Sequence, residues 1–252
     1  MRVALVQHDV VFEDAPATLE HLWPLVVSAG RQGAGLVVLT EMCSTGFSMD
    51  TDRGAEPPGG PGARFLADAA AATGAAVCGS LSVRDPALPL PVNRFVCAFP
   101  DGRSVHYDKI HPFTFGGEAR HYGAGSGVVT FPVGDLAVTP FVCYDLRFGD
   151  RFWDAAEASD AYVVVANWPA PRQAHFRALA VARAIENQAY VLATNRVGSG
   201  GGLDYAGGTI AVGPFGEILA EAGTGEETLL VDLDHARVAE VRDRYRFLAD
   251  RR

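Results

Sequence analysis

The feature that most constrains the fold of this sequence is a series of short apolar runs that recurs along the chain. The runs are Val3–Val6, Leu36–Leu39, Ala76–Val83, Arg94–Phe99, Leu136–Val142, Ala161–Ala166, Tyr190–Thr194, Thr209–Val212 and Leu229–Leu233. Runs of this length that are rich in apolar and β-branched residues predict buried β-strands. We therefore expect sheets in the interior of the molecule.

Longer stretches between these runs have helical spacing. They are Ala17–Gln32, Ala63–Ala72 and Arg172–Gln188. Pro24 predicts a kink or a break in the first of these helices, Gly74 is a suitable stop for the second, and a shorter helix is expected after Asp150. Strands that alternate with helices and are then followed by consecutive strands favour a layered α/β architecture with the helices outside.

Length and composition indicate a single domain that spans residues 1–252. The chain is 48% hydrophobic and 20% charged, which suffices for a large core, and its net charge of −9 argues against nucleic acid or an anionic membrane as a partner. The apolar run near Met1 is shorter than the roughly 7–15 residues of a secretory signal, and no stretch approaches the about 18 apolar residues of a membrane span. We expect a cytoplasmic protein.

The four cysteines are Cys43, Cys78, Cys97 and Cys143. None belongs to a C-x-x-C pair or lies beside a histidine cluster at zinc spacing, so no metal site is expected. Cysteines this far apart in an intracellular chain argue for reduced thiols. Burial as small apolar side chains is the simplest expectation for Cys78 and Cys97.

Three segments place a reactive side chain where a strand ends. Cys143 follows Leu136–Val142, and Glu41 follows Leu36–Leu39. Lys109 lies between strand residues and a proline. Ligand sites in α/β sheets gather at the carboxyl ends of strands, where a desolvated carboxylate can act as a base and an ammonium can stabilise an oxyanion. Cys43, two residues after Glu41, is a rival thiol, and each of these residues could also be structural.

Taken together, these segments resemble the nitrilase superfamily, the carbon–nitrogen hydrolases with a Glu–Lys–Cys triad. The similar segments, in family order, are Thr40–Glu41, Tyr107–His111, Cys143–Phe148, Ala166–Pro169, Ala182–Val191, Asn195–Gly198, Gly207–Thr209 and Gly213–Glu217. The resemblance spans about Val3 to Leu233. The chain departs from it at Thr40, where many members have proline.

The resemblance implies a four-layer αββα sandwich and a two-step reaction through a thioester, without a cofactor. Glu41 would take the proton of Cys143, and Lys109 with the backbone N–H of Tyr144 would hold the oxyanion. Glu118 would orient Lys109 or the hydrolytic water, unless it is a solvated loop acid. Family members usually form homodimers, so a homodimer is expected.

Within the superfamily, the segments around Asn167–Arg172 and Phe115–Tyr122 look most like the bacterial omega-amidase branch. This implies hydrolysis of the terminal amide of a small monoamide such as 2-oxoglutaramate or 2-oxosuccinamate. Arg147 and Arg172 could clamp a substrate carboxylate, or could be surface residues, and Trp168 would wall the pocket. The alternatives are another amidase of the superfamily, such as an N-carbamoyl amino acid hydrolase, a nitrile-hydrolysing enzyme, and, in a different class, a non-catalytic binding protein on the same fold.

Overall fold

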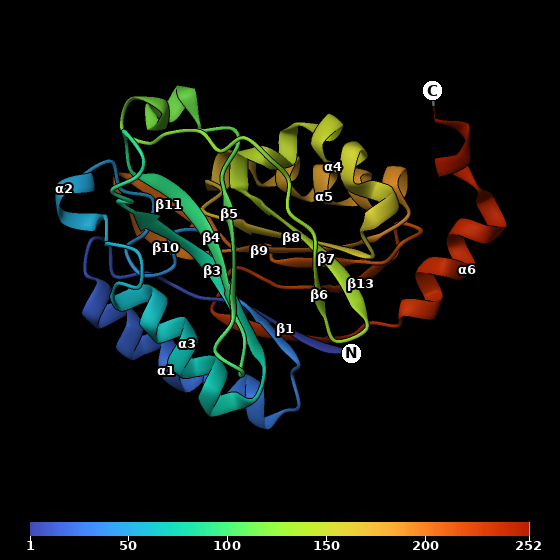
Figure 1. Cartoon of the computed structure of the whole chain (residues 1–252), viewed down its shortest axis with the longest axis horizontal. Helices are drawn as coiled ribbons and strands as arrows, with labels where there is room; N and C mark the ends of the chain where they lie inside the picture. The colour runs from blue at the N-terminus through green and yellow to red at the C-terminus, as the bar shows by residue number, and fades with distance from the viewer. Residues whose placement is uncertain (252) are drawn as a thin grey trace.

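Two six-stranded sheets form the centre of the protein in the computed structural model, which describes residues 1–251 (Figure 1). The first sheet has the order β14 (Glu227–Asp232), β1 (Arg2–Gln7), β2 (Leu36–Val38), β3 (Ala76–Val83), β4 (Val92–Ala98) and β5 (Ser104–Asp108). The second has the order β13 (Ile218–Glu221), β12 (Ile210–Val212), β9 (Tyr190–Asn195), β8 (Ala161–Ala166), β7 (Leu136–Val142) and β6 (Phe131–Val133). A separate hairpin pairs β10 (Val197–Gly200) with β11 (Leu203–Ala206).

Helices cover the outer face of each sheet. Figure 1 shows α1 (Ala15–Arg31) and α3 (Pro61–Thr73) on one side of the molecule and α4 (Gly149–Ala155) and α5 (Gln173–Asn187) on the other. The short α2 (Thr51–Gly54) lies beside the first pair, and α6 (His235–Tyr245) extends away from the sheets toward the C-terminus. The result is the four-layer αββα sandwich that the sequence predicts.

Strand β1 shows why the central strands read as continuous apolar runs. Val3 and Leu5 belong to the core that includes residues of both sheets, whereas Ala4 and Val6 pack with α1 and α3. Successive side chains of a strand point to opposite faces, so a strand with both faces covered needs apolar residues at every position.

Strand direction brings several strand ends to one edge of the sandwich. β1, β2 and β3 are parallel. β4 runs antiparallel to β3, and β5 runs antiparallel to β4, so β5 points in the same direction as β1, β2 and β3. In the second sheet, β7, β8 and β9 are also parallel. The loops after β2, β5, β7 and β8 carry Glu41, Lys109, Cys143 and Asn167.

The predicted break at Pro24 is wrong. α1 continues through Pro24. Proline has no N–H to donate to the carbonyl of Glu20, but both residues are exposed, so water can bond that carbonyl instead. The sequence patterns did not predict β6, β10, β11, β13, α2 and α6. β13 and the hairpin are largely exposed and α6 buries only a narrow stripe that includes Val238 and Val241, so none has a strong apolar pattern.

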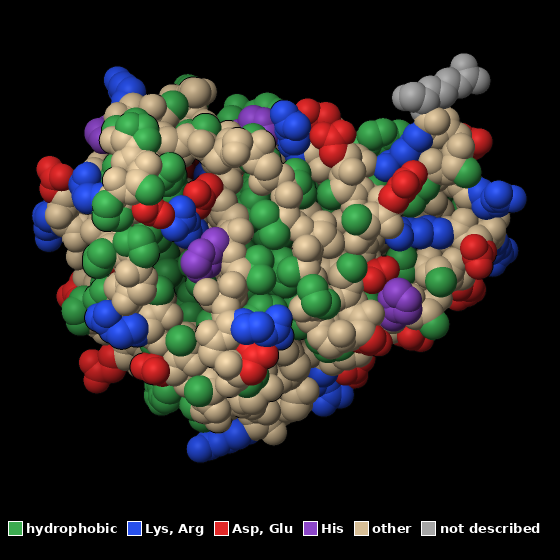
Figure 2. All heavy atoms as spheres, in the orientation of Figure 1, with side chains coloured by type: hydrophobic (Ala, Val, Ile, Leu, Met, Phe, Trp, Pro, Cys, Tyr) green, Lys and Arg blue, Asp and Glu red, His purple; other side chains and the backbone are tan. Residues whose placement is uncertain are grey.

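Side chains of both charges share the visible surface. On the face shown in Figure 2, Lys and Arg side chains are interspersed with Asp and Glu side chains. Among residues 1–251, none of the helices combines the length and the apolar character that a bilayer crossing requires.

Candidate active site

A buried ammonium lies between two buried carboxylates at the edge where the strands end. Lys109 Nζ is 2.8 Å from Glu41 Oε1, and 3.1 and 2.8 Å from the two carboxylate oxygens of Glu118. All three side chains are at most 1% exposed. Isolated charges at such burial are strongly unfavourable, so each group depends on the others for its ionised form.

Asn93 of β4 connects the two carboxylates. Its Nδ2 donates to Glu41 Oε1 at 2.8 Å and to Glu118 Oε1 at 3.1 Å. Its Oδ1 accepts from the Ser80 hydroxyl at 2.7 Å, and that hydroxyl oxygen accepts from the backbone N–H of Met42 at 2.8 Å. Because every polar atom of this amide is engaged, Asn93 has one orientation and supplies donors to both acids.

Cys143 begins the turn that follows β7. Its backbone φ of +46° lies in the left-handed region, which is uncommon and strained for a residue other than glycine. The side chain is 9% exposed and lines a pocket. The first N–H groups of a helical turn have no partner within that turn, so the N–H of Tyr144 is available beside the thiol.

Asp145 holds this turn against the lysine segment. Its carboxylate accepts from the hydroxyl of Tyr107 at 2.8 Å and from the backbone N–H of Val142 at 3.1 Å. It also accepts from the backbone N–H of His111 at 2.9 Å, and His111 Nδ1 lies at the same distance. One buried carboxylate therefore fixes the strand exits that carry Cys143 and Lys109.

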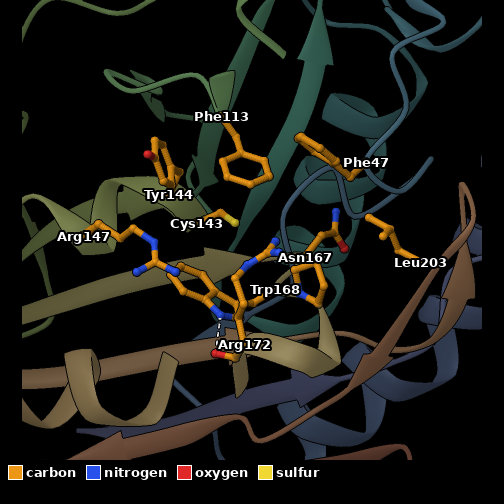
Figure 3. A pocket seen from close by; sticks show the side chains of 10 residues that line it. Phe47, Phe113, Cys143, Tyr144, Arg147, Asn167, Trp168, Arg172 and Leu203 are labelled. Carbon is orange, nitrogen blue, oxygen red and sulfur yellow. Dashed lines mark hydrogen bonds between the residues drawn. The ribbon is translucent and has the colours of Figure 1, made fainter. Parts of the chain in front are cut away.

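The pocket beside the thiol is narrow and mostly apolar. Figure 3 shows its walls, which are Phe47, Phe113, Cys143, Tyr144, Arg147, Asn167, Trp168, Pro169, Arg172 and Leu203. The space between them, open mouth included, is about 370 Å³. A narrow apolar pocket with a few polar groups suits a small molecule whose orientation those groups set.

Two guanidinium groups border this pocket without a carboxylate partner among residues 1–251. Arg147 lies over the ring of Trp168 at 4.8 Å, and one of its nitrogens is 3.3 Å from His175 Nδ1. Arg172 lies 5.3 Å from the ring centre of Phe113. Both side chains are half-buried. Their stacking leaves the planar donor edges free for an anion.

The pKa shifts follow from burial and from these charges. Burial alone lowers the pKa of Lys109, but Glu118 and Glu41 outweigh it and raise that pKa well above its ordinary value. Burial and the charge of Glu41 raise the pKa of Cys143, although Lys109 opposes them. Burial also raises the pKa of Glu118. Lys109 therefore lowers the pKa of the thiol by less than burial and Glu41 raise it, and the thiol keeps its proton at neutral pH.

Comparison with known proteins identifies the family. The sequence model described as carbon-nitrogen hydrolase matches residues 2–243 of this chain. The chain belongs to the carbon–nitrogen hydrolase family. It is 36% identical over 248 residues to the protein named omega-amidase YafV of Escherichia coli K12, which covers 97% of this chain and 94% of that protein.

Two further similarities support the same family and fold. This hydrolase is 32% identical over 216 residues to the 2-oxoglutaramate amidase of Bacillus subtilis, which covers 83% of this chain and 82% of that protein. It superimposes with a TM-score of 0.95 and 33% identity on XC1258 from Xanthomonas campestris, over 100% of this chain and 97% of the other. That structure is described as a CN-hydrolase superfamily protein with an arsenic adduct in the active site. The resemblance to the omega-amidase branch is thereby confirmed, and this chain is an amidase-type carbon–nitrogen hydrolase.

The structure brings the predicted residues of this hydrolase together. Glu41, Lys109 and Glu118 form one cluster, and the charges of Glu41 and Lys109 shift the pKa of Cys143 in opposite directions. The predicted binding residues Tyr144, Arg147, Trp168 and Arg172 all line the pocket. Glu118 is not a solvated loop acid, since it is fully buried.

Cys43 does not compete with Cys143 for this position. It is fully buried, and burial raises the pKa of its thiol to about 12. It lies outside the pocket lining, where its sulfur is close to Gly79. Arg183 forms an ion pair with Glu186 at 2.7 Å and also donates to the carbonyl of Leu146 in the turn after Cys143.

Several residues of the site were not predicted from the sequence. They are Phe47, Asn93, Asp145, Asn167 and Leu203. Asp145 and Asn167 lie inside motifs that were recognised, at a strand exit, so their position was an available signal. Asn93 lies near the start of β4, Phe47 lies in a loop and Leu203 begins the exposed strand β11, so no local pattern marks them.

Proposed function

We propose that this hydrolase releases ammonia from the terminal amide of a small monoamide that carries a carboxylate, with 2-oxoglutaramate and 2-oxosuccinamate as the best candidates. The observation that carries the proposal is the pair of half-buried guanidinium groups, Arg147 and Arg172, beside the pocket of Cys143. A carboxylate at the far end of the substrate can accept bidentate hydrogen bonds from a guanidinium. The names of the E. coli and B. subtilis relatives support the same substrate class.

The proposed reaction begins with proton transfer. Because the raised pKa of Cys143 keeps the thiol protonated, Glu41 accepts its proton as the sulfur attacks the amide carbon. A carbon–sulfur bond forms, and the carbonyl π electrons move to oxygen. Lys109 and the N–H of Tyr144 stabilise this oxyanion.

Collapse of the tetrahedral intermediate completes the first half of the reaction. The carbonyl re-forms, the carbon–nitrogen bond breaks, and the proton held by Glu41 passes to nitrogen, so that ammonia leaves. Water then attacks the thioester while a carboxylate of the cluster takes its proton. The carbon–sulfur bond breaks, the sulfur regains a proton, and the carboxylic acid is released. Division of amide cleavage into two steps lowers the barrier of each.

An ammonia-release assay tests the substrate class. The panel consists of 2-oxoglutaramate, 2-oxosuccinamate, simple aliphatic amides and N-carbamoyl amino acids. We expect turnover of the oxo-acid monoamides and at most weak turnover of the others. Turnover of N-carbamoyl compounds alone would contradict the proposed substrate.

Intact mass after incubation with substrate tests the covalent step. We expect an acyl adduct on the wild type and none on Cys143→Ala. Cys43→Ala is the matched control, because that buried thiol lies outside the pocket, and it should form the adduct as the wild type does. An adduct that persists in Cys143→Ala would refute the assignment. The homodimer and the cytoplasmic location stay predictions, and gel filtration with light scattering would measure the first.

A further inference from the structure

We propose that Asn167 recognises the N–H group of the scissile amide through its side-chain oxygen and thereby selects primary amides. This inference rests on the proposed function and adds a residue that receives the leaving nitrogen. It is carried by the orientation of the Asn167 side chain, by the lack of a partner for Oδ1 and by the place of Asn167 in the pocket wall (Figure 3).

Two hydrogen bonds to Glu41 fix the orientation of Asn167. Its backbone N–H donates to Glu41 Oε2 at 2.9 Å, and its Nδ2 donates to the backbone carbonyl of Glu41 at 2.9 Å. A carbonyl oxygen can only accept, so the amide nitrogen must face it and the side chain cannot be flipped. Oδ1 is therefore the atom left for another partner.

The oxygen of Asn167 is buried and unpaired. The residue is 3% exposed, and Oδ1 has no hydrogen-bond partner among the described residues 1–251. Buried acceptors are rarely left unpaired, because they lose their bonds to water. Asn167 lines the same pocket as Cys143 and is hydrogen-bonded to Glu41, the proposed base. A donor on a bound substrate is the partner that this arrangement fits.

A primary amide supplies that donor at the required place. Its carbonyl oxygen is held by the proposed oxyanion groups, so its nitrogen projects away from them with two N–H bonds. The guanidinium groups of Arg147 and Arg172 are donors only and cannot receive an N–H. As the carbon–nitrogen bond breaks, the nitrogen gains a proton and positive character, so its bond to Asn167 Oδ1 strengthens in the transition state.

Comparison of an amide with its ester separates recognition of nitrogen from a general structural role. The probes are 2-oxoglutaramate and the matching omega-methyl ester of 2-oxoglutarate, which has no N–H. In Asn167→Ala we expect kcat/KM for the amide to fall about tenfold more than kcat/KM for the ester, the effect of one lost hydrogen bond. Asn167→Asp keeps an acceptor oxygen but replaces the donor that faces the Glu41 carbonyl with a second oxygen, so both rates should fall. The wild-type preference for the amide over the ester should nevertheless persist.

Asn195→Ala is the matched control. Asn195 holds the neighbouring residue Trp168 through hydrogen bonds to its N–H and carbonyl at 2.7 and 3.1 Å, so its loss loosens the same segment without removing a free acceptor. Both substrates should then slow by the same factor. An equal loss for both substrates in Asn167→Ala would overturn the inference, whereas a wild type that hydrolyses neither probe would contradict the proposed function itself.

Discussion

Replacement of Glu118 by glutamine is the sharpest test of the buried charge cluster. The carboxylate receives four hydrogen bonds, two from Lys109 Nζ, one from Asn93 Nδ2 and one from the backbone N–H of Phe113. Each oxygen accepts two of these, so either orientation of a glutamine amide places its NH₂ against two donors. Hydrogen bonds to charged groups contribute about 1.5–3 kcal/mol each, so the variant should lose about 3 kcal/mol or more of stability.

The kinetic effect of this replacement should be larger than a change in binding. In this variant the amide oxygen keeps one hydrogen bond from Lys109, but the amide NH₂ faces the ammonium and Glu41 is the remaining charged partner. Lys109 is then no longer centred for the oxyanion, so we expect kcat to fall about 10²–10³-fold. The charge of Glu118 is the largest influence that raises the pKa of Lys109. Its removal should therefore move the alkaline limb of the kcat/KM profile to lower pH.

Urea unfolding and ammonia release across pH measure both effects. Glu56→Gln is the control, because Glu56 accepts from the backbone N–H groups of Gly62 and Ala63 and lies outside the pocket. It should lower stability but leave kcat unchanged. A misplaced oxyanion donor should cost far more than threefold in kcat. A folded Glu118→Gln enzyme whose kcat stays within about threefold of the wild-type value would therefore refute the role of Glu118 in placing Lys109.

Three further variants test other parts of the structure. Burial lowers the pKa of His8 from the ordinary 6.5 to about 4, so between these pH values the unfolded state binds more protons than the folded state. The free energy of unfolding should therefore fall by about 3 kcal/mol as the pH drops from 6.5 to 4. Urea unfolding of His8→Gln at pH 6.5 and pH 4 should show that most of this loss is removed. Asn93→Leu removes the donor shared by Glu41 and Glu118, which should raise the pKa of Glu118 further and move the acid limb of the kcat/KM profile to higher pH; an unmoved limb would contradict this role. Arg172→Gln should raise KM about tenfold or more for 2-oxoglutaramate but not for a neutral aliphatic amide, and an equal rise for both would argue against a carboxylate clamp.

The motif residues and the buried strands could be predicted because each depends on a short stretch of sequence. β3, β7 and β8 match the predicted runs residue for residue, since strands covered on both faces are mostly apolar. Elements with an exposed face, such as β13 and α6, have no such requirement and were missed. Thr40 in place of the common proline had no predictable role, yet its hydroxyl lies 2.9 Å from Nε2 of the buried His8 in the adjacent strand exit.

The sequence by itself determined the family, the layered architecture and the chemical groups of the site, because these follow from local patterns and motifs. The tertiary structure alone decided how those groups act on one another. Burial, not sequence position, raises the pKa of Cys143, and the pairing of β3 with β4 brings Asn93 and Ser80 beside the two carboxylates. The free oxygen of Asn167 likewise exists only because both of its donors are directed to Glu41, which is 126 residues away in sequence.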